Sequence, residues 1–554
     1  MSSLVRERRT WPPGLFWLAV ILLATLPARL SLMRQSLGLD EAWVANSVLA
    51  NSWHEMFQGT TWVQSSPPLF LTLLRSVIAA AGPGDWALRL VPWLASLSAC
   101  VVLFLALKPM FGRAAALLGA TMLATNYWAI KMAQQVKPYG ADLLVSALFL
   151  YALQGTLTQG RGRRSVLLLA GLCCLGHFVS SPAVFWLPST LAALAVRAFW
   201  RDGDGRPRAL FVTKARAKRL AGLTLAVAVS LGLNYFIFLR PNLGNDLKEY
   251  WRDAFMNFDG LPYALVAFGQ NLGHLLLPPA SRLAVYASSA VLIIALAGLG
   301  CALVDVLRAA PRGPGCSEGI TDPAAVALLA GPLPILAGMA FSLAHLYPLL
   351  TYPRMIVWLL PCIVTLVAHA LQRGLRLVEE RLAGPAGHRV LDFGVPAACL
   401  VAAVAGQALL FRYPRPAEHN RPAVQLLASQ AAAHDTIFLH GGTSEAFAYY
   451  SRLLGWRPRS VYLGNTGWPC CPKNQQERVS HPEVREFADD LILAAGQARG
   501  HRLWLYLPAA TDGHWTRPQR STLESAARHL AGAGCTEHLR KSFDQIQVWA
   551  FDCK

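Results

Sequence analysis

The chain has 554 residues, of which 54% are hydrophobic, and a formal net charge of +19. Soluble domains contain about 45–50% apolar residues, and here the excess lies in runs of about 20 residues, the length that crosses a bilayer. This excludes a purely soluble protein and indicates a polytopic membrane protein. Because the basic residues gather in short loops between apolar runs, the charge does not indicate nucleic-acid binding.

The first apolar run extends from about Trp11 to Met33, after a basic N-terminus. It has the length of a full span and no clear small-residue cleavage site, so we interpret it as a membrane span and not as a signal peptide. The stretch "SLGLDEAWVANSV" follows it directly and carries two adjacent carboxylates, Asp40 and Glu41.

Two basic segments fix the expected orientation of the spans. The N-terminus and the loop Arg197–Arg219 are both rich in arginine, so both are expected in the cytoplasm. Seven apolar runs between them would place them on opposite sides, so one run does not cross. The best candidate is Ser66–Gly82, which is short and carries Arg75 in its middle. We expect it to lie in the outer interface.

The remaining runs predict about eleven transmembrane helices, with a cytoplasmic N-terminus and an external C-terminus. They lie at about 11–33, 87–107, 113–130, 141–156, 165–180, 182–199, 220–239, 283–307, 323–343, 353–371 and 390–411.

This topology places several ionisable groups on the outer side, together with Asp40 and Glu41. Such groups at membrane depth are costly and tend to mark a functional site. The alternative is that each arginine extends to the lipid headgroups. The residues in the other outer stretches are Arg89, Lys137, Tyr139, His177, Arg240, His345, Tyr352 and Arg354.

After Arg412 the composition changes to short strand-like runs separated by helical or loop segments. We therefore predict a transmembrane domain over 1–411 and a small external α/β domain over 412–554. In the latter, "HGGTSEAFAYY" is either a strand-to-helix turn able to hold an anion or a purely structural turn. No cysteine spacing matches a zinc site. In an oxidising compartment the disulfide candidates are Cys470 or Cys471, Cys535 and Cys553.

Carboxylates and cations together at a bilayer surface suit the chemistry of a lipid-linked phosphosugar. Breaking the sugar–phosphate bond leaves an anionic lipid phosphate, which arginine and lysine stabilise. A carboxylate can take the proton of the acceptor hydroxyl and favours an oxocarbenium-like sugar carbon. The alternatives for Asp40 and Glu41 are a solvated acidic pair in the loop or charges at a helix N-terminus.

Five short motifs occur in a fixed order along the chain: "LGLDEAW", "SSPPLF", "DWALRLVPWL", "QQVKPYGADLLV" and "YPRMIVWLLP". In this order they resemble the GT-C superfamily, in particular the bacterial group similar to protein mannosyltransferases and lipid A aminoarabinose transferases (glycosyltransferase family 39 type). The resemblance implies a membrane enzyme that uses polyprenyl-phosphate sugars, with interfacial helices and an acidic active-site residue in the first external loop. It also implies inversion at the anomeric carbon.

The chain departs from this family at two places. Gln135 and Lys137 stand where many relatives have an acidic residue and an arginine, and Ser65 and Ser66 stand where His or Lys often precedes Pro-Pro. Lysine keeps the charge but loses the two-pronged hydrogen bonding of arginine. The donor sugar and the acceptor therefore stay open.

The leading hypothesis is a hexosyl- or pentosyltransferase that moves one sugar from a polyprenyl phosphate to a glycan, lipid or protein acceptor. The reaction would take place on the outer face of the bacterial inner membrane. Asp40 would be the base, and Glu41 would orient the site or share that role. The substrate-binding residues would be Arg89, Lys137 and Arg354, which hold phosphate, and Tyr139, His345 and Tyr352, which line the site. We expect no cofactor and no metal ligands, while a divalent-metal requirement stays open.

Three alternatives stay open. An oligosaccharide transferase or polymerase acting on lipid-linked glycans would need a larger acceptor groove. A transporter or flippase would place charges near the bilayer midplane and often show paired halves, and we find no internal repeat. A structural assembly protein that binds cell-wall polymer would not need Asp40.

Overall fold

A computed structural model describes residues 13–57, 65–157, 162–200, 214–240, 251–277, 282–309, 322–350, 353–381, 393–412, 419–464, 484–508 and 520–554. The chain divides into two compact units. One, here called the helical unit, comprises residues 1–31, 91–235 and 251–413, and the other, the mixed unit, comprises residues 32–90, 236–250 and 414–554. The segment 32–90 thus groups with the C-terminal region. The predicted division at residues 411 and 412 assigned that segment to the transmembrane domain.

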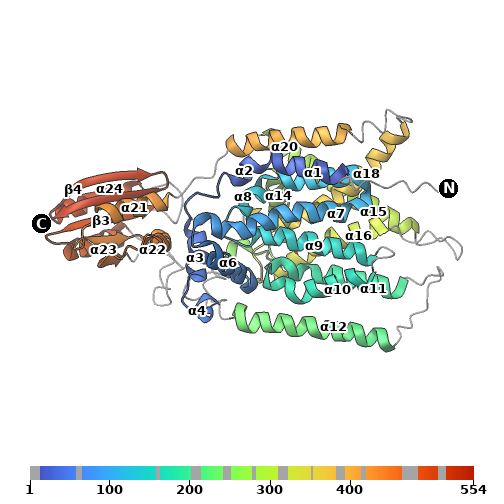
Figure 1. Cartoon of the computed structure of the whole chain (residues 1–554), viewed down its shortest axis with the longest axis horizontal. Coiled ribbons are helices and arrows are strands. Elements are labelled where there is room, and N and C mark those ends of the chain that lie inside the picture. The colour runs from blue at the N-terminus through green and yellow to red at the C-terminus, as the bar shows by residue number, and fades with distance from the viewer. Residues whose placement is uncertain are drawn as a thin grey trace, which may run out of the picture. The chain divides into compact units, whose positions relative to one another are not determined.

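The helical unit is built of helices that lie roughly parallel to one another (Figure 1). Its α-helices are α1 (Pro13–Ala24), α2 (Leu26–Leu30), most of α7 (Asp85–Thr125), α8 (Tyr127–Ala133), α9 (Tyr139–Leu157), α10 (Gly162–Leu175), α11 (Leu187–Trp200), α12 (Lys214–Leu233), α14 (Leu261–Leu276), α15 (Arg282–Ala309), α16 (Asp322–Ala330), α17 (Pro332–Leu343), α18 (Leu360–Arg381) and α20 (Val395–Arg412). Short 3-10 or π segments join them at η1 (Gly176–Phe178), η2 (Ser181–Trp186), η3 (Asn234–Leu239), η5 (Arg252–Ala254) and η6 (Pro353–Leu359).

Within the described residues, six helices are long and apolar enough to cross a membrane. They cover Asp85–Thr125, Tyr139–Leu157, Ala221–Leu239, Val285–Leu307, Pro323–Leu343 and Pro353–Leu377. Each overlaps at least one predicted span. Shorter apolar helices overlap the first, sixth and last predicted spans, at Gly14–Ala24, Ser181–Ala195 and Val395–Ala408. The count of about eleven crossings stays a prediction.

The longest helix, α7, corresponds to two predicted spans. Its 41 residues would extend over about 60 Å, twice the hydrocarbon thickness of a bilayer. Gly112 interrupts it with a positive φ of 79°, a backbone conformation that glycine adopts without a Cβ clash. The helix is therefore two helices that meet at Gly112, inside the basic turn "KPMFGR" predicted between the spans.

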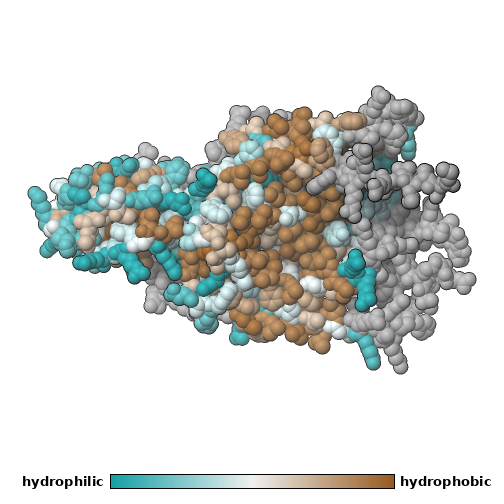
Figure 2. Space-filling view, viewed as in Figure 1, coloured by the Kyte–Doolittle hydropathy of each residue, from teal (hydrophilic) through white to brown (hydrophobic). Residues whose placement is uncertain are grey.

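The surface of the helical unit carries large apolar side chains that water would not favour. Figure 2 shows a broad hydrophobic band over the helices on the face in view. On α12 and α15 the exposed side chains include Leu225, Val229, Ile293 and Leu296, each at least half exposed. An exposed apolar surface of this extent marks contact with lipid or a partner, and together with the candidate spans it identifies a multi-pass membrane protein.

The described residues of the first loop, in the mixed unit, form the helices α3 (Leu39–Val48), α4 (Trp53–Phe57) and α6 (Pro68–Ala81). The last of these is the segment expected to lie in the interface. Its 14 residues extend over about 21 Å, which is short of the roughly 30 Å needed to cross a bilayer. Its non-crossing orientation stays a prediction.

The C-terminal part of the mixed unit is a five-stranded sheet of order β2-β1-β3-β5-β4. Parallel pairing joins β1 to β2 and β3, and antiparallel pairing joins β5 to β3 and β4. The strands are β1 (Thr436–Leu439), β2 (Ser460–Leu463), β3 (Arg502–Pro508), β4 (Cys535–Phe543) and β5 (Ile546–Cys553). The helices are α21 (Asn420–Gln430), α22 (Ser444–Leu453), which follows the 3-10 turn η8 (Gly441–Thr443), α23 (Val484–Gln497) and α24 (Arg520–Gly532).

Helices cover both faces of this sheet. On β3, Leu503, Leu505 and Leu507 join a core with side chains of α23 and α24. Trp504 and Tyr506 alternate with them and are also fully buried, and Tyr506 packs against Phe447 of α22. A strand buried on both faces reads as a continuous apolar run, which is why "RLWLYLP" could be predicted.

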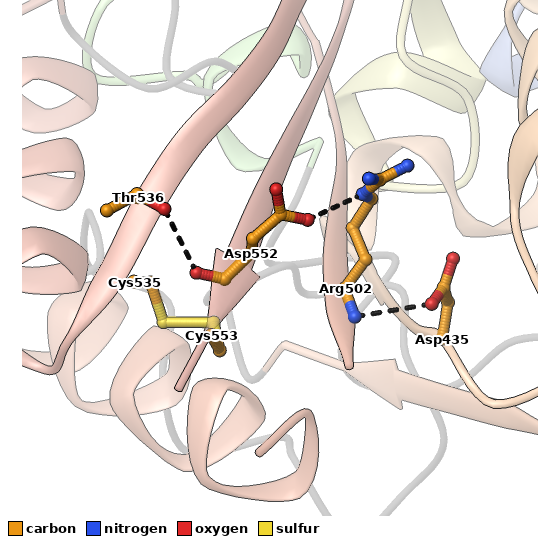
Figure 3. Close-up of a disulfide and its surroundings, with 6 residues drawn as sticks. All are labelled: Asp435, Arg502, Cys535, Thr536, Asp552 and Cys553. Carbon is orange, nitrogen blue, oxygen red and sulfur yellow. Dashed lines mark hydrogen bonds and ion pairs between the residues drawn. A yellow bond between two sulfur atoms is a disulfide. The ribbon is translucent and has the colours of Figure 1, made fainter. Parts of the chain in front are cut away.

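A disulfide joins the last strand to its neighbour. Cys535 and Cys553 are directly opposite in the β4–β5 register, and their sulfurs are bonded (Figure 3). Beside it, Arg502 Nε lies 2.9 Å from Asp552 Oδ1. Cys535 and Cys553 were both among the predicted disulfide candidates. The other candidates, Cys470 and Cys471, lie outside the described residues.

Candidate active site

The acidic pair lies in the first turn of α3. Gly38 is the N-cap in an extended conformation, and its N–H donates to Glu41 Oε2 over 3.3 Å. This bond is one half of a capping box and satisfies the N–H of the N-cap residue, while glycine has no side chain to supply the other half. Asp40 and Glu41 both stand where the helix dipole favours negative charge.

Glu41 is fully buried and forms an ion pair with Arg89 at the start of α7. Both side chains are 1% exposed, and Arg89 Nε and Nη2 each donate to one carboxylate oxygen over 3.0 Å. Such two-pronged pairing is the strongest arrangement that arginine makes with a carboxylate. A buried carboxylate held in this way has a fixed position and no room to contact a substrate.

The other donors of Arg89 hold the loop that precedes α3. Nη1 donates to the carbonyls of Leu32 and Gln35, and Nη2 donates to the carbonyl of Ser36. With the two bonds to Glu41, all five N–H groups of the guanidinium are used. The geometry therefore gives Arg89 a positioning role, where the sequence predicted a phosphate ligand.

Asp40 differs from its neighbour in exposure. Its side chain is partly exposed, whereas Glu41 is buried. A proton acceptor must reach its proton donor within hydrogen-bond distance, so of the two only Asp40 has the access that a base needs. The sequence alone left their roles divided between base and orientation.

Lys137 and Tyr139 flank the N-terminus of α9 in the helical unit, and both are partly buried. Gly140 fixes this turn, because a Cβ there would lie 2.0 Å from the carbonyl oxygen of Pro92. Only glycine allows so close an approach between α9 and α7. The motif "KPYG" thus positions two predicted site residues by backbone packing.

His345 and Arg354 both contact the segment that begins at Trp251. The ring of His345 stacks on Phe255 with centroids 5.2 Å apart, and its Nε2 lies 2.9 Å from Asn257 Oδ1. The guanidinium of Arg354 lies 5.8 Å from the ring centroid of Trp251, within the range of a cation–π contact. Tyr352 lies outside the described residues.

His345 also has a positive φ of 56°, unusual for a residue with a side chain. Such backbone strain is concentrated at functional sites. No site residue was predicted around Trp251, where the order "EYWRDAFMNF" of aromatic and polar residues was the available signal.

Asp142 is a further polar residue that sequence reasoning missed. It lies in the first turn of α9, is 5% exposed, and its Oδ1 has no hydrogen-bond partner among the described residues. A buried unpaired carboxylate oxygen is costly. It lies on α9 three residues after Tyr139.

The turn "HGGTSEAF" is satisfied internally. His440 Nδ1 accepts from the N–H of Gly442, and Thr443 Oγ1 donates to the carbonyl of His440. Burial lowers the pKa of His440 to about 4, so the ring is neutral. Glu445 occupies the first turn of α22, and burial raises its pKa. These features favour a structural turn over an anion site.

Groups of three or more His, Cys, Asp or Glu able to hold a metal ion are absent from the part of the chain that the structure describes. A metal requirement is therefore a question for assay.

Comparison with known proteins finds a match to one family model and to several solved structures. Residues 65–204 match the family model of dolichyl-phosphate-mannose-protein mannosyltransferases. The fold is similar to that of ArnT from Cupriavidus metallidurans bound to undecaprenyl phosphate, with a TM-score of 0.52 and 15% identity over 97% of each chain. A likeness at this level of identity shows the fold.

A second solved structure is similar at a lower level. It is the oligosaccharyltransferase AglB from Archaeoglobus fulgidus, in complex with an inhibitory peptide and a dolichol-phosphate, with a TM-score of 0.49 and 12% identity. The match covers 90% of this chain and 70% of AglB. A comparison with curated proteins finds no match.

The segment that matches the family model contains only part of the predicted site. The matched segment 65–204 contains Arg89, Lys137 and Tyr139, while the acidic pair precedes it. His345, Tyr352 and Arg354 follow it. The roles of these residues stay predictions.

Proposed function

We propose that this protein is a GT-C glycosyltransferase that transfers one sugar from a polyprenyl-phosphate donor to an envelope acceptor. The observation that carries the proposal is the first turn of α3. There Arg89 fixes Glu41 in a buried ion pair and leaves the partly exposed Asp40 beside it. Because the buried ion pair holds the turn that carries Asp40, this carboxylate fits a catalytic group better than a solvated surface charge.

In the proposed reaction the hydroxyl oxygen of the acceptor attacks the anomeric carbon of the donor sugar. The bond from that carbon to the phosphate oxygen breaks, and its electron pair stays on the lipid phosphate. The hydroxyl proton passes to the carboxylate of Asp40. Attack opposite the leaving phosphate inverts the anomeric carbon.

Cations must stabilise the phosphate as its charge increases. We assign this role to Lys137 and Arg354, with Tyr139, His345 and Tyr352 lining the site. Arg89 we assign to positioning, because its N–H groups hold Glu41 and the preceding loop. Two cations from different segments then share the phosphate, as a lysine point charge and a guanidinium fork.

The donor class is supported by the ArnT structure, which is bound to undecaprenyl phosphate. An acceptor that is a glycan, a lipid or a protein, and a hexosyl or a pentosyl donor, all fit the same chemistry. We place the protein in the bacterial inner membrane, with its N-terminus in the cytoplasm and the C-terminal domain outside. The basic loops between apolar runs support this orientation. We propose no resident cofactor, and activity in the presence of a chelator decides whether a divalent metal is required.

The test is transfer of radiolabelled sugar from polyprenyl phosphate by membranes that contain the protein. Asp40→Asn should lower kcat by about 10²–10⁴-fold, the usual contribution of a general base. Asparagine is nearly isosteric, so membrane insertion should be unchanged. The matched control is Glu55→Gln on the neighbouring helix α4, where Glu55 accepts from the N–H of Asn51. It should leave transfer at the wild-type rate.

Normal transfer by an Asp40→Asn protein that inserts normally would refute Asp40 as the base. Transfer only of preassembled oligosaccharides would favour the oligosaccharide-transferase alternative. Movement of the lipid-linked substrate across vesicles without any transfer would favour the flippase alternative.

A further inference from the structure

The loop that leads into the acidic helix is held by the C-terminal domain as well as by Arg89. This loop, residues 32–38, connects α2 to α3. Leu37 is its key residue, because its backbone lies directly before the N-cap Gly38 and three positions before Asp40. Any displacement of Leu37 therefore moves the first turn of α3.

Both backbone groups of Leu37 bond to side chains of the C-terminal domain. The N–H of Leu37 donates to the hydroxyl of Tyr450 over 2.6 Å, and the Leu37 carbonyl accepts from Asn420 Nδ2 over 2.8 Å. The next residue back is held too, since Ser36 Oγ accepts from the N–H of Arg421 over 3.1 Å. We call Asn420, Arg421 and Tyr450 the loop clamp.

The loop clamp is anchored on the same helix end that carries Arg89. The hydroxyl of Tyr450 donates to Asp85 Oδ1 over 3.1 Å, and Arg421 Nη2 lies 2.8 Å from Asp85 Oδ2. Asp85 precedes Arg89 by one helical turn of α7. The loop is thus bound from one side by Arg89 and from the other by the clamp.

Tyr450 is suited to this double role. It is fully buried, and its hydroxyl uses its proton on Asp85 while its oxygen accepts from Leu37. Burial and the neighbouring Asp85 raise its pKa well above the ordinary value, so the hydroxyl keeps its proton at any physiological pH. The guanidinium of Arg421 lies 5.7 Å from the Tyr450 ring centroid.

A second contact joins α22 to the middle of α3. Asn46 Nδ2 donates to the carbonyl of Glu445 over 2.9 Å, and Asn46 is 3% exposed. The domain therefore contacts α3 both before its first turn and along its length. A domain that served only to recruit an acceptor would need none of these bonds.

We propose that Asn420, Arg421 and Tyr450 are positioning residues for catalysis, holding the first turn of α3 so that Asp40 reaches the reacting atoms. This rests on the proposed function of Asp40. The C-terminal domain is then a part of the active-site scaffold that acts over more than 400 positions of sequence, from Tyr450 to Leu37.

The test compares Tyr450→Phe with Tyr449→Phe in the full-length protein. Phenylalanine at 450 keeps the ring and removes the one hydroxyl that joins Leu37 to Asp85. Tyr449 is the matched control because it lies on the same helix, is fully buried, and has a hydroxyl without a hydrogen-bond partner among the described residues.

Two measurements are made on each purified variant: hydrogen exchange of the peptides covering residues 32–48, and steady-state transfer from polyprenyl-phosphate sugar. Tyr450→Phe should raise exchange in this segment and lower kcat on the order of 10- to 100-fold, the cost of misplacing a reacting group. The donor KM should change little, because the clamp acts on the loop before Asp40 and is assigned no part in holding the phosphate. Tyr449→Phe should match the wild type in both measurements.

Wild-type kcat in Tyr450→Phe, with or without raised exchange, overturns the proposal. An equal kcat loss in Tyr449→Phe also overturns it, since it shows a general packing effect. If Tyr450→Phe does not fold, Arg421→Gln tests the same clamp at a side chain that is 36% exposed. Should the wild type transfer no sugar, the proposed function fails, and the exchange measurement still decides whether the clamp holds the loop.

Discussion

The ion pair between Glu41 and Arg89 predicts a strong and non-additive dependence of local stability on both residues. Removing one partner of a buried pair leaves an uncompensated charge and costs about 3–5 kcal/mol. In Glu41→Gln, Arg89 keeps its three carbonyl acceptors and one amide oxygen, so we expect the lower end, about 3 kcal/mol. In Arg89→Met, a buried carboxylate and three carbonyls lose their donors, so we expect at least the upper end, about 5 kcal/mol.

The double variant separates the pair from its surroundings. The double variant has neither charge. Its loss of stability should therefore be smaller than the sum of the two single losses by about 2–3 kcal/mol, which lies within the range of interaction energies for residues in contact. The assay is native-state hydrogen exchange of the α3 amides in the full-length protein, which reports the free energy of local opening. The control is Glu537→Gln in the pair with Arg540, whose side chains are 42% and 48% exposed; it should cost under about 1 kcal/mol. Additive single costs, or wild-type exchange in Glu41→Gln, would refute the coupling.

Three further predictions follow from single side chains. Lys137→Ala should raise the donor KM or lower kcat strongly, while Lys137→Arg should keep much of the activity; equal losses would show that the position is structural. Cys535→Ser with Cys553→Ser should lower the thermal midpoint, because the bond closes a loop with a sequence separation of 18, worth about 3 kcal/mol; an unchanged midpoint would contradict this. The pKa of His440 is lowered from 6.5 to about 4, so the unfolded chain binds its proton first as the pH falls. The wild type should therefore lose up to about 3 kcal/mol of stability between pH 7 and pH 4. His440→Gln should remove that part of the pH dependence in thermal unfolding, and equal slopes for both proteins would show that His440 is not buried neutral.

Elements with a strong apolar pattern could be predicted from the sequence, and those that depend on a partner could not. The runs that became β1, β2, β3 and β5 were recognised because apolar residues dominate them. The strand β4, "CTEHLRKSF", was missed because most of its side chains are exposed at the edge of the sheet. Its strand conformation comes from pairing with β5, which no local pattern records.

The site shows the same division between local and long-range information. A helix start at Asp40 and Glu41 was one of the alternatives that the sequence left open, since acidic residues favour a helix N-terminus. That Glu41 pairs with Arg89, 48 positions away, depends on the packing of α3 against the start of α7. For this reason the sequence predicted Arg89 as a phosphate ligand, and its geometry supports positioning instead.

The helical geometry explains why two neighbouring carboxylates can have different roles. Consecutive side chains on an α-helix point about 100° apart, so when Glu41 turns inward to Arg89, Asp40 turns toward a different surface. The alternative of a solvated acidic pair requires both side chains to be exposed. Glu41 is 1% exposed, which argues against it. The buried charge of Arg89 requires an acid at position 41. The ion pair does not require an acid at position 40. A partly exposed carboxylate on a turn that Arg89 and the loop clamp hold from two sides has the fixed position and the access that a general base needs.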